Sequence, residues 1–216
     1  MRDGARRRIT GLHVLTDVRE GRDALGVAAA AAAAGASVIQ VRVKGSPDRA
    51  LYEFASSVVE ICASYDALCI VDDRVDIALA SGADGTHLGA FDLPMRVARS
   101  VVAPAHLLGG TARSPADAVA LVRDGADYLG VGPAYPTATK SGLPEALGPT
   151  GVAAVTCAVD VPVIAIGGIG VTRVSPLMAA GAAGVAVVSA VSDAPDPATA
   201  TRALLDALGR AGWEPR

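Results

Sequence analysis

Residues 161–190, VPVIAIGGIGVTRVSPLMAAGAAGVAVVSA, contain the pattern that decides the fold. A β-branched run ends in Gly167 and Gly168, and a helical stretch, Val171–Ala180, follows it. A glycine comes directly after that stretch, and a second β-branched run begins at Gly184. A strand, a helix and another strand in this order predict parallel strands joined by a crossover helix.

The same unit recurs along the chain. Helical stretches such as Pro47–Ser64 and Pro115–Arg123 separate eight runs that we expect to be strands, at 12–16, 37–42, 67–72, 85–89, 106–110, 127–132, 161–168 and 184–190. Eight strands that alternate with eight helices predict a single-domain α/β protein, a (β/α)8 TIM barrel. A doubly wound open sheet is the alternative, but no G-x-G-x-x-G motif follows the first strand.

Composition and charge limit the class of protein. The 216 residues are 51% hydrophobic, enough for a sizeable core, and the formal net charge of -3 argues against a general nucleic-acid binder. Residues 1–10, which include the basic run Arg6–Arg8, are predicted to form a flexible N-terminal tail, and residues 11–212 the barrel.

Nothing in the sequence predicts targeting or a membrane partner. The apolar stretch ITGLHVLTD is too short for a signal peptide, and Ala28–Ala34 falls short of the roughly 20 residues that a membrane span needs. Cys62, Cys69 and Cys157 lack metal-ligand spacing, so we expect reduced core cysteines in a cytoplasmic protein. A homodimer is expected only because dimers are the commonest assembly.

The second predicted strand carries polar residues on one side. Gln40, Arg42 and Lys44 alternate with valines, so the three side chains should point towards the barrel interior or its mouth. Burying two cations is costly, and a bound anion or nearby carboxylates would relieve that cost. An exposed edge strand is the alternative interpretation, although a closed barrel has no edge.

Carboxylates follow the next two predicted strands. Asp72 and Asp73 end the third strand, and Asp92 follows the fourth. Two neighbouring carboxylates can hold Mg²⁺, which takes its remaining ligands from water and substrate phosphates. Alternatively, Asp73 and Asp92 cap the helices that follow them.

Anion-binding features follow the later strands. Glycines after residues 161–166 let backbone N–H groups approach a ligand, and Ser189 adds a hydroxyl at the eighth strand. The loop GVGPAYPTATKSG, residues 130–142, adds Thr137, Thr139 and Lys140 with no acid among them. The mouth of the barrel is therefore predicted to hold two phosphorylated groups side by side.

The three histidines show no ligand spacing and are expected in the core or in polar networks.

Several segments, in order along the chain, resemble thiamine-phosphate synthases. They are HVLTD, VIQVRVKG, VDDRVDIALASGADGTHLGAFDLP, GADYLGVGPAYPTATK, VPVIAIGGI and AGAAGVAVVSA. The most specific parts are the Thr137–Lys140 segment and the HLG…DLP segment. The resemblance implies a Mg²⁺-dependent transferase that joins hydroxymethylpyrimidine diphosphate to thiazole phosphate, giving thiamine phosphate and pyrophosphate.

The resemblance also implies roles for individual residues. Asp73 and Asp92 match the metal ligands. Lys140 matches the lysine on the diphosphate, and Lys140, Arg42 and Lys44 are the expected catalytic residues. The remaining expected substrate contacts, from both halves of the site, are Gln40, Asp72, Thr111, Thr137, Thr139, Gly168, Val188 and Ser189.

The chain also departs from the family pattern. Asp72 stands where the family usually has Asn, Ala90 and Val43 replace a Gln and a Glu, and the Asn after GGI is missing. A related thiazole tautomerase is one alternative, but Arg113 stands where that family carries a histidine. A barrel that binds phosphates or thiamine precursors without turnover is the other.

Overall fold

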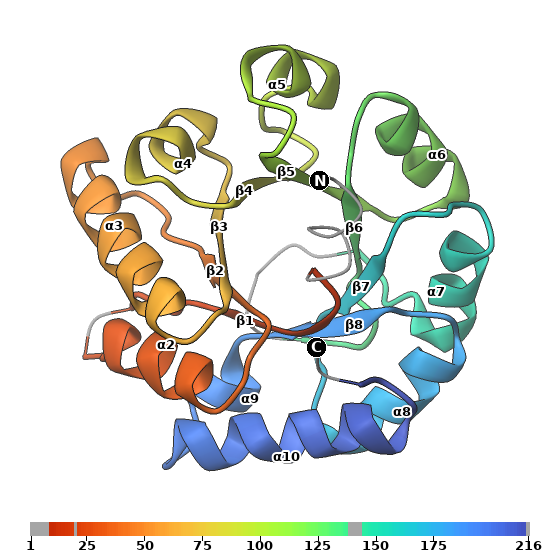
Figure 1. The fold of residues 1–216 in the computed structure, drawn as a ribbon. Helices are drawn as coiled ribbons and strands as arrows, with labels where there is room; N and C mark the ends of the chain where they lie inside the picture. The colour runs from red at the N-terminus through yellow and green to blue at the C-terminus, as the bar shows by residue number, and fades with distance from the viewer. Residues whose placement is uncertain (1–8, 20, 138–143, 215–216) are drawn as a thin grey trace.

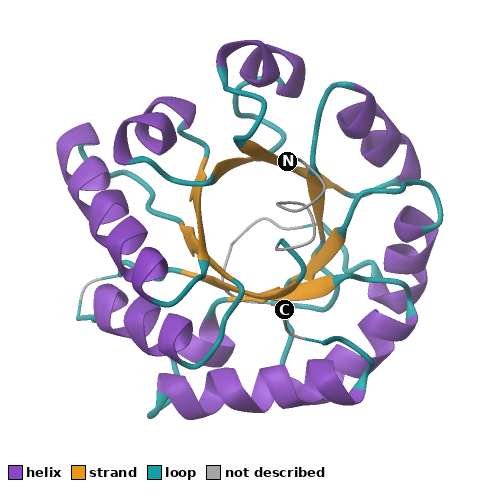
Figure 2. Ribbon diagram, in the orientation of Figure 1, coloured by secondary structure: helices purple, strands orange, loops and turns teal. Residues whose placement is uncertain are grey.

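The computed structural model describes residues 9–19, 21–137 and 144–214. Eight parallel strands form a closed barrel in the order β1-β2-β3-β4-β5-β6-β7-β8, so each strand pairs with its neighbours in the sequence and β8 closes onto β1. The helices form a ring outside the strands (Figures 1 and 2). The predicted TIM barrel is confirmed, and closure excludes the open sheet.

The strands are short, between four and six residues. They are β1 (Gly11–Leu15), β2 (Val38–Val41), β3 (Leu68–Asp72), β4 (Gly85–Leu88), β5 (Leu107–Ala112), β6 (Tyr128–Val131), β7 (Val163–Ile166) and β8 (Gly184–Val187). The helices are α2 (Ala24–Ala33), α3 (Asp48–Ser64), α4 (Val75–Ser81), α5 (Met95–Val101), α6 (Pro115–Arg123), α7 (Gly148–Thr156), α8 (Val171–Ala179), α9 (Ser189–Ser192) and α10 (Pro197–Arg210).

The strands separate two hydrophobic cores. Alternate residues such as Cys69 and Val71 face the outer core between the strands and the helices. Leu68 and Ile70, from the same strand, belong to a smaller core inside the barrel. Burial on both faces explains why the strands read as nearly continuous apolar runs.

Glycines keep part of the barrel interior open. A Cβ at Gly109 would lie 2.2 Å from Cζ of Tyr128, and a Cβ at Gly130 would lie 2.9 Å from Cε1 of His87. These two positions therefore leave room for the large side chains of Tyr128 and His87. Gly130, His87 and Tyr128 line a cavity in the barrel.

Both ends of the described chain pack against the barrel. Ile9 is fully buried in the inner core, so it and Thr10 belong with the barrel rather than with the predicted tail. Trp213, one residue beyond the predicted end of the barrel, packs against Gly11, whose φ of 93° places it in the left-handed region. Residues 1–8 lie outside the described residues.

Two details differ from expectation. The described chain has two helices after β8, the short α9 and then α10, where the sequence predicted one. Cys157 is exposed, because it follows the last residue of α7 at the solvent-facing end of that helix, whereas Cys62 and Cys69 are buried as expected.

Candidate functional site at the mouth of the barrel

A cavity of about 330 Å³ opens at the carboxyl ends of the strands. Every predicted site residue that the structure describes lines it: Gln40, Arg42, Lys44, Asp72, Asp73, Asp92, Thr111, Thr137, Gly168, Val188 and Ser189. Thr139 and Lys140 lie outside the described residues. Residues that are almost 150 positions apart in the sequence thus share one cavity, as a barrel requires of its strand ends.

The ends of β2, β3 and β4 form what we call the charged side of the cavity: Arg42, Lys44, Asp72, Asp73 and Asp92. The predicted alternation along β2 is confirmed, since Val41 and Val43 pack into the outer core while Arg42 and Lys44 face the cavity. The ammonium of Lys44 pairs with the carboxylate of Asp73, so part of the positive charge is already balanced.

Asp73 and Asp92 meet across the charged side. Burial and the hydrogen bond with Asp73 raise the pKa of Asp92. Burial alone would raise the pKa of Asp73 too, but hydrogen bonds with Lys44 and Asp92 outweigh it and lower that pKa. Two interacting carboxyl groups that face a cavity suit a cation, which would favour both charged forms.

Neither aspartate caps a helix. Arg74 is the N-cap residue of α4 and Pro94 that of α5, and neither helix has a side-chain cap. Instead, Asp92 accepts a hydrogen bond from the Gly89 amide at 2.6 Å. The capping interpretation is therefore wrong.

The donor set around these aspartates fits Mg²⁺. Among the residues that the structure describes, no group of three or more His, Cys, Asp or Glu side chains could hold a metal. Magnesium often binds through only one or two carboxylates, together with substrate phosphates and water. Asp73 and Asp92 could therefore hold it without a third protein ligand.

Asp72 has a hydrogen-bond partner on the neighbouring strand β2. Its Oδ1 accepts a hydrogen bond from Nε2 of Gln40 at 2.5 Å. Burial raises the pKa of Asp72 to about 7, against the opposing effect of the Gln40 hydrogen bond. Around neutral pH, Asp72 is thus only partly ionised, which weakens its repulsion of a bound anion.

The opposite part of the cavity, which we call the uncharged side, consists of Gly167, Gly168, Val188 and Ser189. Gly167 and Gly168 have φ angles of 101° and 63°. A Cβ at Gly168 would come within 2.4 Å of the Pro136 carbonyl oxygen. Glycine is required here because the loops after β6 and β7 pack directly on each other.

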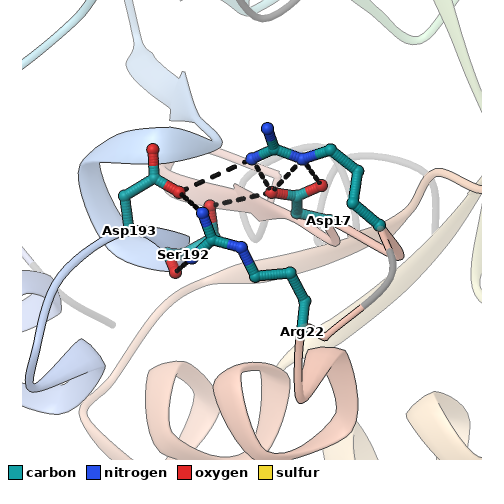
Figure 3. Close-up of polar contacts among 5 residues, drawn as sticks. Asp17, Arg22, Ser192 and Asp193 are labelled. Atoms are coloured by element: carbon teal, nitrogen blue, oxygen red, sulfur yellow. Dashed lines mark hydrogen bonds and ion pairs between the residues drawn. The ribbon is translucent and has the colours of Figure 1, made fainter.

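Arg22 anchors the short helix that carries Ser189. Its guanidinium donates to the Ser192 carbonyl at 2.9 Å and to the Asp193 carboxylate at 2.6 Å (Figure 3). The Ser192 hydroxyl also donates to Asp17 at 3.4 Å. The segment before α2 thereby holds the end of α9 through Ser192 and Asp193. These contacts act on Ser189 only through the helix.

The floor of the cavity is polar but uncharged. His87 lies within 2.9 Å of the Thr111 hydroxyl through Nε2 and within 3.2 Å of the Tyr128 hydroxyl through Nδ1. Burial lowers the pKa of His87 to about 4, so its ring is neutral at physiological pH. The expectation of a core or polar-network position is confirmed for His87, but neither His87 nor Tyr128 is among the site residues expected from the sequence. Their alternation with outward-facing neighbours was the available signal.

Comparison with known proteins identifies the family. The family model described as "Thiamine monophosphate synthase" matches residues 12–191. A thiamine-phosphate synthase from Salinispora tropica is 52% identical over 200 residues, 91% of this chain and 96% of that protein. One from Methanoculleus marisnigri is 43% identical over 207 residues, 95% and 98% of the two chains. The chain belongs to the thiamine-phosphate synthase family.

The solved structures agree with this assignment. Thiamine phosphate pyrophosphorylase from Pyrococcus furiosus superimposes with a TM-score of 0.88 at 36% identity, covering 97% of this chain and all of that one. A 3-hexulose-6-phosphate synthase, at 20% identity and a TM-score of 0.68, shows only that the fold is shared. As a thiamine-phosphate synthase, the chain is a transferase of thiamine biosynthesis that acts on small molecules.

Arg113 has a structural part in this thiamine-phosphate synthase. Its guanidinium donates to the Gly132 carbonyl at 3.0 Å and to the Glu145 carbonyl at 2.8 Å. A guanidinium that stays charged and holds two carbonyl groups cannot act as the proton shuttle of a tautomerase.

In the described part of the chain, no helix is both long and apolar enough to cross a bilayer.

Proposed function

We propose that the cavity binds hydroxymethylpyrimidine diphosphate on its charged side and thiazole phosphate on its uncharged side. The observation that carries the proposal is the division of one cavity into these two sides. Both ligands are anionic, but only the diphosphate must leave as a free, highly charged product. The side with cations and a metal-binding aspartate pair suits that leaving group.

On the charged side, Arg42 and Lys44 would contact the diphosphate, and Lys140 is predicted to join them. Asp73 and Asp92 would hold Mg²⁺, which, when bound, neutralises part of the charge on the diphosphate. The pairing of Lys44 with Asp73 supports this arrangement, because it keeps the ammonium beside the metal-binding pair.

On the uncharged side, the thiazole phosphate would meet backbone N–H groups near Gly168, Val188 and Ser189, with the hydroxyls of Ser189, Thr137 and Thr139 as further donors. The loops after β7 and β8 form the usual phosphate site of this fold. These groups would bind the phosphate through backbone and hydroxyl donors rather than through charged side chains.

The reaction needs alignment more than acid–base help. The aminopyrimidine is electron-rich enough to release pyrophosphate and form a stabilised cation, and the thiazole nitrogen then bonds to the carbon that the pyrophosphate left. The chain's residues orient both rings over the neutral floor of His87, Thr111 and Tyr128. Cationic side chains near the departing phosphates lower the barrier electrostatically.

The test is to incubate the purified protein with both substrates. Thiamine phosphate and pyrophosphate should form in equal amounts, should require Mg²⁺, and should not form with either substrate omitted. An Asp206→Asn variant, altered at an exposed position on α10, is the matched control for aspartate variants in the site. Tight binding of both substrates without pyrophosphate release would refute the proposal and favour a binding protein.

The homodimer and the cytoplasmic location stay predictions. Sedimentation of the purified chain, with a mass of 21.5 kDa per protomer, tests the first.

A further inference from the structure

His13 provides an unused hydrogen-bond acceptor beneath the cavity. It lies on β1 between Leu12 and Val14, which face the outer core, so its ring points into the barrel. The residue is 1% exposed, yet it lines the cavity. Among the buried side-chain nitrogen and oxygen atoms of the described residues, Nδ1 of His13 is the one without a hydrogen-bond partner.

The tautomer of His13 follows from its other nitrogen. Nε2 lies 2.6 Å from the Ile9 carbonyl oxygen, which can only accept, so Nε2 carries the hydrogen. Burial lowers the pKa of His13 to about 4, which keeps the ring neutral. Nδ1 therefore presents a lone pair, and a buried acceptor left without a donor is unusual in folded proteins.

The surroundings of His13 leave this lone pair for a ligand. The ring centroid of Tyr128 lies 5.9 Å away, but the Tyr128 hydroxyl is engaged with His87. Val38 pairs with His13 across the β1–β2 ladder, and Gln40, two residues further along, points inward above it. His13 lines the cavity, so a ligand that fills the bottom of the cavity would lie against its ring, and Nδ1 is the atom of that ring without a hydrogen-bond donor.

We propose that Nδ1 of His13 accepts a hydrogen bond from the amino group of the pyrimidine substrate. This inference rests on the proposed function and extends it, because it makes His13 a specificity determinant for the aminopyrimidine. Of the two substrates, only the aminopyrimidine carries an N–H donor on its ring. The thiazole ring offers an acceptor nitrogen and no donor.

Nitrogen-15 NMR of the wild-type protein with ring-labelled histidine tests this directly, since the chain has only three histidines. Adding hydroxymethylpyrimidine diphosphate alone should move the Nδ1 resonance of His13 to lower frequency, as accepting a hydrogen bond does. Thiazole phosphate alone should leave it in place. His106, whose Nε2 already pairs with the Thr86 hydroxyl outside the cavity, is the internal control.

Kinetics give the second measurement. His13→Phe keeps a ring of similar size but removes the acceptor, so KM for the pyrimidine diphosphate should rise about tenfold while KM for thiazole phosphate stays constant. His106→Phe is the matched variant and should change neither KM.

An Nδ1 resonance that the pyrimidine diphosphate does not move, or that both substrates move equally, would overturn the inference even if the enzyme is fully active. Failure of the wild-type protein to form thiamine phosphate would instead overturn the proposed function, so the two failures are distinguishable.

Discussion

The two sides of the cavity offer different groups to anionic ligands. The charged side has five ionisable side chains at the ends of three neighbouring strands. The uncharged side has glycines, a valine and a serine after two other strands. Anion binding on the charged side would therefore depend on ionisable side chains, which pH and substitution can change. On the uncharged side it would depend on the shape of the backbone.

The proposed placement of one substrate on each side accounts for this difference. A leaving group gains charge during the reaction, so groups that stabilise it should act most strongly in the transition state. A phosphate that only anchors its substrate is bound equally well in the ground state and in the transition state. Substitutions on the charged side should therefore lower kcat, and those on the uncharged side should raise KM.

The largest effect is expected for Asp92→Asn. Removing one carboxylate of the pair that we propose binds Mg²⁺ should lower kcat by about 100-fold at saturating substrate, because it weakens neutralisation of the diphosphate. Measurement of pyrophosphate release against Mg²⁺ concentration should show a higher requirement for the metal. The asparagine can still accept the Gly89 hydrogen bond, so the loop should keep its conformation.

The Asp206→Asn control should retain wild-type kinetics. If Asp92→Asn changed only KM for thiazole phosphate, the two sides would not divide the reaction as we infer.

The raised pKa of Asp72 predicts how the free energy of unfolding depends on pH. Its carboxyl titrates near 3.8 when unfolded and at about 7 when folded, mainly because burial disfavours the charge. Between these pH values the native state holds a proton that the unfolded state releases, so the free energy of unfolding should fall as the pH rises from 4 to 7. The full shift corresponds to about 4 kcal/mol, and because Asp72 is partly exposed to the cavity we expect about 2 kcal/mol.

Urea unfolding at several pH values in metal-free buffer checks this. Asp72→Asn should remove the Asp72 contribution to the decline while it keeps an acceptor for Gln40. A variant whose stability fell with pH as steeply as the wild type would show that Asp72 does not carry the effect.

The fold could be predicted from the sequence because each unit repeats the same local pattern. Pro115–Arg123 was predicted to the residue, since Ser114 caps it and Pro115 begins it. The short helix α9 was missed because four residues give no helical period to recognise. The burial of Ile9 was missed too, since one apolar residue after a basic run carries no local signal.

The site could be predicted wherever a residue ends a strand. Gln40, Arg42 and Lys44 were placed correctly because a period of two decides which side of a strand they face. The unpartnered nitrogen of His13 could not be foreseen, because it depends on what β6 and the residues before β1 place around the ring. The same holds for Asp72, whose partner Gln40 lies on another strand.

The uncharged side should be sensitive to shape. Gly168→Ala places a Cβ within 2.4 Å of the Pro136 carbonyl oxygen at a φ of 63°, so the two loops must separate. We expect KM for thiazole phosphate to rise about tenfold, with KM for the pyrimidine diphosphate unchanged. Gly170→Ala, which meets no atom within 4 Å, is the matched control. A selective loss of pyrimidine binding would contradict the division of the cavity.

The smallest effect is expected for Arg22, which acts on the uncharged side from a distance. Because it holds Ser192 and Asp193 at the end of α9, Arg22→Ala should loosen the helix that begins at Ser189 (Figure 3). KM for thiazole phosphate should rise about three- to fivefold at unchanged kcat, and Arg22→Lys should restore part of the loss. Arg210→Ala, at an exposed position on α10, controls for loss of charge. If Arg22→Ala lowered kcat and left both KM values constant, α9 would take part in the chemical step. The uncharged side would then do more than anchor its substrate, and its contrast with a charged side that acts in the transition state would no longer hold.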